Sequence, residues 1–394
     1  MKTKQGVIVK DLVLVGGGHS HVIVLKMFAL NPLPGVRLTV ITRDAYTPYS
    51  GMLPGYVAGH YDFDEVHINL QRLCQSAGAH MYHDEAVGID LPSNQVICKS
   101  GPAVPYDVLS INIGSTPNFN GIPNGLEFTT PVKPISNFID RWQALLKRNT
   151  EKPGNLRIGV VGAGAGGIEL LLAVQFRLKK LLMEKSRTPN CIEFHAIFKS
   201  ETILPEFKRA VRKRFERHLN NRNVRLHAGV KATDAASDGI IVGGNKKIEL
   251  DEVFWATEAA APNWLKTSGL DVDDLGFIRV RDTLQTTTHD NIFASGDIAS
   301  LINHPRPKAG VFAVRQGSPL AKNIRSVLVG GKARPFSPQK SFLKLISTGD
   351  KNAVAAKWGW TFEGALVWQW KNWIDRRFIR RLSNIPGIST KPYS

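Results

Sequence analysis

Two stretches of the chain repeat one order of apolar, glycine and amphipathic segments. The first runs from residues 11–21 (DLVLVGGGHSH) through an apolar helical stretch to residues 36–42 (VRLTVIT). The second runs from residues 157–167 (RIGVVGAGAGG) through residues 168–182 to residues 192–198 (IEFHAIF). Short apolar runs are typical of buried strands, so each stretch predicts a strand, a glycine turn, a helix and a second strand, the start of a βαβ unit.

The glycines in both turns have the spacing of a dinucleotide-binding fingerprint. The first glycine allows a tight bend, and the second lets the backbone approach a pyrophosphate at the helix N-terminus. One such turn is weak evidence, but two in the same context predict two nucleotide sites, with ordinary tight turns as the alternative. The predicted binding residues are Gly16, Gly17, Gly18, His19 and His21 in the first turn, and Gly162, Gly164, Gly166 and Gly167 in the second.

Both copies depart from the ideal fingerprint. His21 stands at the position of the third glycine, and the acid expected after the second strand is replaced by Thr42 in one copy and Phe198 in the other. Arg43 and Lys199 follow these positions and are predicted cofactor-binding residues. Loss of the acid beside Lys199 favours a 2′-phosphate, whereas a plain surface lysine leaves NADH open, so the nucleotide is predicted as NADH or NADPH.

Composition and charge limit the classes of protein and partner. The chain has 394 residues, 43% of them hydrophobic, and single cores stop growing at about 250–300 residues, so two domains are expected. The net charge of +18 favours phosphates, nucleic acid or an anionic membrane surface as partners. No uncharged apolar run reaches the roughly 18 residues of a transmembrane helix.

Cysteine usage argues against disulfide bonds and metal sites. Cys74, Cys98 and Cys191 lie far apart and form no Cys-x-x-Cys pair, so we expect no disulfide framework and no metal site. A reducing compartment fits this usage, and the apolar run at residues 12–15 is too short for the core of a signal peptide. We predict a cytoplasmic protein, either free or peripheral on the inner face of a membrane.

Further segments resemble the pyridine nucleotide–disulfide oxidoreductase superfamily and its type II NADH dehydrogenase relatives. Residues 106–117 (YDVLSINIGSTP) are similar to the strand that crosses back past the first dinucleotide, and residues 254–257 (FWAT) to its partner in the second domain. Residues 291–297 (NIFASGD) resemble the segment whose aspartate bonds the ribityl chain of the flavin. The resemblance spans residues 10–335 and implies FAD and a nicotinamide dinucleotide as cofactors.

A narrower resemblance concerns one group within that superfamily. Residues 16–21, 47–55 (TPYSGMLPG), 308–317 (KAGVFAVRQG) and 362–378 are similar to members that are often fused ahead of selenide, water dikinase. No dikinase sequence is present, so we expect either a standalone protein or the front half of a fusion. The resemblance thus implies selenide, water dikinase as a fusion or binding partner.

These patterns predict an α/β fold with two Rossmann-like dinucleotide-binding domains. The FAD-binding domain is expected in two parts, residues 1–125 and 271–335, with the NAD(P)-binding domain, residues 126–270, inserted between them. Residues 336–394 are expected to form a C-terminal extension with a helical segment rich in tryptophan and arginine. Homodimer formation is an alternative that the sequence leaves undecided.

The loop after the second strand decides how electrons leave the flavin. Disulfide reductases of the resembled superfamily place two cysteines there, but residues 46–55 contain none, which excludes a dithiol relay and requires the acceptor to meet the flavin directly. Packing between domains is the alternative role for this loop. The resemblance gives as flavin-site residues Pro48, Met52, Leu53, Gly114, Asp297, Lys308, Ala309, Gly310 and Val311.

Two residues are catalytic candidates. Glu169 follows the second glycine turn, and in the resembled relatives this glutamate lies near nicotinamide and flavin, where it could steer protons; simple stabilisation of the helix N-terminus is the alternative. Gln316 matches one of two glutamines at the quinone entrance of type II NADH dehydrogenases, whereas Val311 stands at the other. For His19 and His21, hydrogen bonding or space filling is favoured over direct chemistry.

The C-terminal extension is aromatic and basic. Five of the eight tryptophans fall between Trp358 and Trp373, and the arginine-rich run 376–381 follows. Tryptophans on one side of a helix and arginines on the other suit an anionic membrane interface, with packing on the flavin domain or a dimer mate as the alternative. The expected apolar face consists of Leu366, Trp370, Trp373, Ile374 and Phe378.

A second basic run, residues 208–217, also predicts a helix, with Val211, Phe215 and Leu219 inward. A solvated basic face is favoured over nucleic-acid binding, because no RNA- or DNA-binding module accompanies it.

The combined prediction is an FAD-dependent NAD(P)H oxidoreductase, similar to type II NADH dehydrogenases, that passes hydride from nicotinamide to flavin and on to a quinone-like acceptor. One alternative makes the acceptor a selenium or sulfur compound that feeds selenophosphate synthesis. Another is a flavin-bearing redox sensor that docks to a partner through its tail.

Overall fold

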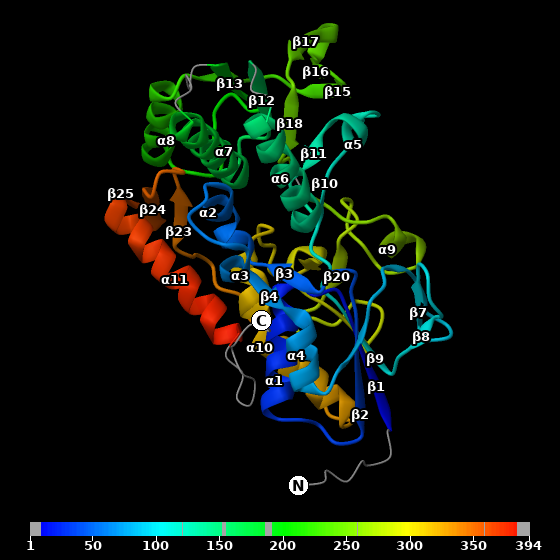
Figure 1. Cartoon of the computed structure of the whole chain (residues 1–394). Coiled ribbons are helices and arrows are strands. Elements are labelled where there is room, and N and C mark those ends of the chain that lie inside the picture. The colour runs from blue at the N-terminus through cyan, green and yellow to red at the C-terminus, as the bar shows by residue number, and fades with distance from the viewer. Residues whose placement is uncertain are drawn as a thin grey trace.

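The computed structural model describes residues 9–119, 121–151, 155–185, 191–257, 259–357 and 359–383. Trp358, counted above among the tail tryptophans, lies outside these residues. Figure 1 shows two α/β lobes, one above the other, with the C-terminal helix beside both.

The first lobe is built on a parallel five-stranded sheet in the order β21-β9-β1-β2-β5. Strand β1 is wholly buried at Leu12 and Leu14, as its continuous apolar run predicts. Helix α1 (His19–Leu30) joins β1 to β2 and packs against α4 (Leu70–Ala77) and α10 (Gly310–Leu328). The strands are β1 (Lys10–Val15), β2 (Val36–Ile41), β5 (His80–Tyr82), β9 (Val108–Ile111) and β21 (Ile292–Ala294).

The second lobe repeats this plan with a parallel sheet in the order β11-β18-β12-β13-β14. The helices on its faces are α6 (Ile135–Glu151), α7 (Ala165–Glu184) and α8 (Arg209–Asn221), and α8 buries Val211, Phe215 and Leu219 as predicted. The α/β fold with two Rossmann-like lobes is therefore confirmed. The strands are β11 (Thr130–Pro131), β12 (Leu156–Val161), β13 (Ile192–Ile197), β14 (Val224–His227) and β18 (Glu252–Trp255).

Small antiparallel sheets complete both lobes and join them. The chain passes between the lobes at β10 (Thr116–Pro117) and β19 (Ala259–Ala260), which pair with each other. Short elements near the crossing are β3 (Tyr46–Pro48), α2 (Leu53–Val57), α3 (Phe63–Val66), β4 (His67–Asn69), α5 (Gly125–Phe128), α9 (Trp264–Thr267), β20 (Ile278–Val280) and β22 (Ala299–Leu301). The outer sheets consist of β6 (Ala86–Asp90), β7 (Gln95–Cys98) and β8 (Val104–Pro105), and of β15 (Ala232–Ala236), β16 (Gly239–Val242) and β17 (Lys246–Glu249).

The C-terminal extension is a three-stranded antiparallel sheet followed by the expected helix. Strands β23 (Lys344–Ser347), β24 (Ala353–Lys357) and β25 (Trp360–Gly364) precede α11 (Ala365–Ser383). The helix packs against β24 of the extension and against β4 and α1 of the first lobe. The sheet was not predicted from the sequence.

The predicted separation of tryptophans and arginines on α11 is only partly correct. Leu366, Trp370 and Trp373 are exposed as one stripe, but the guanidinium of Arg377 lies 5.1 Å from the ring centroid of Trp373. The arginine therefore stands with the aromatic rings, because a planar guanidinium stacks on them. The buried side carries two charged residues among apolar ones, and it consists of Val367, Lys371, Asp375, Ile379 and Leu382.

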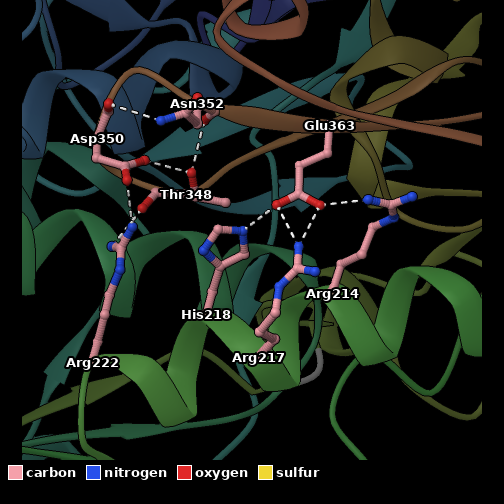
Figure 2. A network of polar contacts seen from close by, with 8 residues as sticks. All are labelled: Arg214, Arg217, His218, Arg222, Thr348, Asp350, Asn352 and Glu363. Atoms are coloured by element: carbon pink, nitrogen blue, oxygen red, sulfur yellow. Dashed lines mark hydrogen bonds and ion pairs between the residues drawn. The ribbon is translucent and has the colours of Figure 1, made fainter.

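An ion-pair network fastens the extension to the second lobe (Figure 2). Glu363 of β25 accepts from three side chains of α8: Arg214 at 2.6 Å, Arg217 at 2.9 Å and His218 at 2.6 Å. One turn further along, Arg222 donates to Asp350 and to the carbonyl of Thr348, each at 2.7 Å. Arg214, His218 and Arg222, the residue that follows the last residue of α8, are four positions apart and so lie on one face of the helix.

We predict that Glu363→Gln loosens the extension from α8, because Arg214, Arg217 and His218 lose the carboxylate that they share. The expected cost is about 1–2 kcal/mol, since the Glu363 side chain is only 15% exposed and bonds to charged groups are among the stronger ones. Faster hydrogen exchange in β25 would report the change. Glu249→Gln is the matched control, because Glu249 pairs with Arg157 while 69% exposed, and its loss should be nearly neutral; equal exchange in both variants would contradict the prediction.

Candidate functional site

A cavity of about 610 Å³ lies between the two lobes. One wall belongs to the second glycine turn, and the opposite wall to the segment of Asp297 in the first lobe. The strands that cross between the lobes close one side. The predicted site residues that line it are Gly164, Gly166, Gly167, Asp297, Lys308, Ala309 and Gln316.

Backbone atoms of a neighbouring strand press against the first glycine of each turn. Gly16 has φ +90°, and a Cβ there would lie 2.4 Å from the carbonyl oxygen of Asn112. Gly162 has φ +115°, and a Cβ there would lie 2.4 Å from the carbonyl oxygen of Ala256. Only glycine adopts these conformations without strain, so both turns hold the N-terminus of a helix, α1 or α7, close to the end of the sheet.

The third glycine position of the fingerprint is occupied by a different residue in each lobe. In the second lobe, a Cβ on Gly167 would lie 2.1 Å from the carbonyl oxygen of Gly162, so the backbones touch. In the first lobe, His21 Nδ1 lies 2.6 Å from the carbonyl oxygen of Gly16, and Nε2 lies 2.8 Å from Ser110 Oγ. His21 is completely buried, and burial lowers its pKa to about 4. The neutral ring braces the turn with both nitrogens, so it is not placed to contact a cofactor directly.

His19 differs from His21. Its Nε2 is buried without a hydrogen-bond partner among the described residues, and its ring meets Tyr49 edge-on at 5.4 Å between centroids. Burial lowers the pKa of His19 to about 4, so the ring is neutral near pH 7. A buried nitrogen without a partner is costly in a closed protein, and its presence at the first turn fits a bound ligand.

The segment from Tyr46 to Val57 lies between the lobes. Met52 is fully buried in the core of the first lobe, whereas Leu53 and Val57 belong to the core of the second. Pro48 lies in β3, paired with β4. This loop therefore packs between the two lobes, which was the alternative role predicted from the sequence. Among the expected flavin contacts, Gly114 has φ +75° and open space where a Cβ would stand.

Asp297 lies in a short 3-10 turn directly after β21, and Gln316 holds that turn. The backbone N–H of Gly296 donates to Gln316 Oε1 at 2.6 Å, and Gln316 is buried. The structure thus gives Gln316 a positioning contact with the Asp297 turn, in addition to its place in the cavity wall. Val311 is the second residue of α10, which begins at Gly310 after Ala309.

The predicted cations at the site are each held by the protein. Lys308 Nζ donates to the carbonyl of Ala299 at 2.7 Å and lies 3.8 Å from the ring centroid of Phe277, and burial lowers its pKa to about 8. Arg43, beyond the end of β2, pairs with Asp44 at 3.4 Å and with Glu85 at 3.7 Å. Lys199 is exposed beyond the end of β13.

Glu169 is partly buried and contacts the C-terminal extension. The N–H of Ser347 donates to Glu169 Oε1 at 2.5 Å. Burial raises the pKa of Glu169 to about 7, and the ammonium of Lys371 opposes that rise. Protonated and ionised forms of Glu169 therefore coexist near neutral pH, which is the condition for a group that exchanges protons.

Two charged residues on the buried side of α11 complete this cluster and were missed in the sequence. Lys371 Nζ donates to the carbonyl of Gly51 and to Asp375 Oδ2, both at 2.6 Å. The Tyr49 hydroxyl bonds to the Asp375 carboxylate. A lysine and an aspartate four residues apart, in register with Val367 and Ile379, were a signal that could have indicated a buried pair.

The residues present fit two dinucleotides. Helix α1 begins without a side-chain cap, His19 offers a nitrogen without a partner among the described residues, and Asp297 offers a carboxylate at the cavity. At the second turn the N–H of Ala165 donates to Glu206 Oε1 at 3.3 Å, so a carboxylate occupies the N-terminus of α7 where a phosphate would bind. All three cysteines lie in the described part of the chain and none forms a disulfide: Cys74 and Cys98 are buried, and Cys191 is partly buried.

Comparison with known proteins agrees with this geometry. The family model described as pyridine nucleotide-disulphide oxidoreductase matches residues 10–317. The chain belongs to this family. A NADH dehydrogenase-like protein, YutJ of Bacillus subtilis, is 24% identical over 301 residues, 75% of this chain and 78% of YutJ. A type II NADH:quinone oxidoreductase of Staphylococcus aureus is 22% identical over 397 residues, 97% of this chain and 98% of the relative.

Solved structures share the fold at low identity. NDH2 from Plasmodium falciparum, solved with NADH, has a TM-score of 0.79 and 14% identity, covering 95% of this chain and 97% of its own. Sulfide:quinone oxidoreductase from Aquifex aeolicus has a TM-score of 0.77 and 20% identity, covering 95% and 92%. The predicted family, the fold class, the oxidoreductase class and the family cofactors FAD and NAD(P)H are thereby confirmed, whereas the acceptor and the link to selenide, water dikinase stay predictions.

Proposed function

We propose that the protein is an FAD-dependent NAD(P)H dehydrogenase that reduces a quinone-like acceptor directly. The observation that carries this proposal is the shared cavity, in which the second glycine turn faces the Asp297 segment of the first lobe. FAD, when bound, takes hydride from a reduced nicotinamide and passes the electrons to a second acceptor. The matched quinone oxidoreductases among relatives and solved structures support a quinone as that acceptor.

The positions of the cysteine thiols favour direct electron transfer from the flavin to the acceptor. The residues that line the cavity include no cysteine, and burial raises the pKa of Cys74 to about 12. A thiol relay needs a thiolate near neutral pH, which this site does not supply. The acceptor must then reach the flavin itself.

The protein's own contribution to acceptor reduction is a proton source. Glu169 Oε1 accepts from the N–H of Ser347, and the Ser347 side chain also bonds to the carboxyl group. Lys371 faces this carboxylate and is fixed by Asp375 and by the carbonyl of Gly51. We propose that Glu169 donates a proton to the reduced acceptor and that Lys371 stabilises the carboxylate left behind.

The extension also presents an aromatic surface that suits a lipid-soluble acceptor. Trp360 and Phe362 of β25 stack with ring centroids 6.4 Å apart, and both are exposed, as is the stripe of α11 that follows in the chain. No helix in the described part of the chain has both the length and the apolar run needed to cross a membrane. We propose that this aromatic surface rests on an anionic membrane, with Arg377 at the headgroups. It consists of Trp360, Phe362, Leu366, Trp370 and Trp373.

The proposed function is tested by anaerobic titration of the flavin. We expect NADH or NADPH to bleach the flavin absorbance near about 450 nm, and a quinone to restore it rapidly. Bleaching that quinone leaves unchanged, but selenite or polysulfide reverses, would replace the quinone by a selenium or sulfur acceptor. A flavin that neither nucleotide bleaches would overturn the dehydrogenase assignment.

The rate of acceptor reduction should depend on the fraction of Glu169 that is protonated. We expect its rate to fall as pH rises through about 7, because the raised pKa of Glu169 leaves it protonated only below that pH. Glu169→Gln should slow this half-reaction roughly 100-fold and flatten its pH profile, with flavin bleaching by NAD(P)H little changed. Glu184→Gln, an exposed change on the same helix, is the control. An unchanged pH profile in Glu169→Gln would refute the proton role.

Replacing Trp360, Trp370 and Trp373 together by serine should weaken binding to anionic liposomes at low salt at least tenfold, because these rings supply the apolar contact. Turnover with a water-soluble quinone should stay the same. Leu126→Ser, which alters an exposed leucine of the second lobe, is the control. Wild-type protein that fails to co-sediment with the liposomes, or that self-associates through these rings instead, would overturn membrane docking.

A further inference from the structure

Lys133 connects the second lobe to Asp297 of the first. Its Nζ lies 2.7 Å from Asp297 Oδ2 and 3.0 Å from Ser115 Oγ. Ser115 Oγ in turn lies 3.3 Å from the same aspartate oxygen. The three residues come from separate segments, since Ser115 follows β9, Lys133 follows β11 and Asp297 follows β21.

Lys133 and Asp297 both line the cavity between the lobes. The Asp297 side chain is 15% exposed and that of Lys133 is 36% exposed, so the pair is neither sealed nor fully solvated. Of the other lining cations, Lys308 is bonded to the carbonyl of Ala299 and experiences the charge of Asp297 without a hydrogen bond to it, and Arg306 is bonded to the carbonyl of Gln339. Lys133 is therefore the lining cation whose ammonium contacts the Asp297 carboxylate.

The two contacts leave one aspartate oxygen for a ligand. Both hydrogen bonds recorded for the carboxylate, from Lys133 and from Ser115, end on Oδ2. The carboxylate is thus fixed through one oxygen while Oδ1 keeps its lone pairs for a hydroxyl group. Gln316 fixes the same turn by accepting a hydrogen bond from the N–H of Gly296. The orientation of Asp297 is therefore set both through its side chain and through the backbone of its turn.

We propose that Lys133 is a positioning residue for the flavin. It holds Asp297 so that Oδ1 binds a hydroxyl of the ribityl chain, and it neutralises the carboxylate beside the flavin. A reduced flavin carries negative charge, so an uncompensated Asp297 would disfavour reduction. This inference rests on the FAD site of the proposed function and adds a residue from the nicotinamide lobe to it.

The experiment compares Lys133→Met, Lys133→Arg and Lys10→Met. Methionine removes the charge but keeps an unbranched side chain, and arginine keeps the charge. Lys10 pairs with Asp107 at 2.9 Å on the surface of the first lobe, so Lys10→Met removes an ion pair away from the cavity. FAD affinity is measured by fluorescence titration of apoprotein, and the flavin midpoint potential by equilibration with a reference dye.

We expect Lys133→Met to weaken FAD binding about tenfold, the effect of one lost charged hydrogen bond, and to lower the midpoint potential. Lys133→Arg should restore most of both quantities, and Lys10→Met should change neither. If Lys133→Met fails to fold, Ser115→Ala tests the positioning role, with a smaller loss of FAD affinity expected.

The outcomes separate this inference from the proposed function. Unchanged affinity and potential in a folded Lys133→Met protein would overturn the inference and leave the dehydrogenase intact. Weakened FAD affinity with an unchanged flavin midpoint potential in Lys133→Met would support the positioning role. It would overturn the proposed effect of the Lys133 charge on flavin reduction. Wild-type protein that binds no FAD would overturn the proposed function itself.

Discussion

A helix N-terminus can meet a phosphate only where no side chain stands between them, and both lobes are arranged around that constraint. Gly16 and Gly162 each lie where a Cβ would collide with a carbonyl of the next strand, at the same distance of 2.4 Å. The strand, the glycine turn and the helix therefore approach one another with the same geometry in both lobes. The second turn lines the cavity between the lobes, together with the Asp297 segment that follows β21 of the first sheet.

The sequence was sufficient for the features that repeat locally. The glycine spacing predicted both turns, and the period of Val211, Phe215 and Leu219 predicted the buried side of α8 correctly. Contacts between distant segments could not be predicted, because no local pattern records them. Lys371 and Asp375 resembled solvated charges of an amphipathic helix until the fold placed them against Gly51 and Tyr49. Gln316 suggested a substrate contact, whereas the structure shows that it also holds the backbone of Gly296.

The C-terminal extension makes the two lobes one site. Its sheet is fastened to α8 through Glu363 (Figure 2), and its helix reaches the first lobe through Lys371 and the Gly51 carbonyl. Ser347, at the end of β23, binds Glu169 of the second lobe. A single segment thus sets the distance between the lobes and supplies the neighbours of the buried glutamate, while its outer side presents the aromatic surface.

The exchange of a glycine for His21 makes one turn sensitive to acid and leaves its counterpart without that sensitivity. The ring is neutral in the folded protein, with a pKa of about 4, but in an unfolded chain it takes up a proton near pH 6.5. Unfolding therefore binds a proton between these values, and the stability that the neutral His21 ring contributes to the folded protein is lost progressively as pH falls from about 6.5 towards 4. At Gly167 the same position holds only backbone, which does not titrate. Mild acid therefore lowers the stability of the first turn through His21, and it also acts on the sheet of the second lobe through His195 and His227, whose pKa values burial lowers as well.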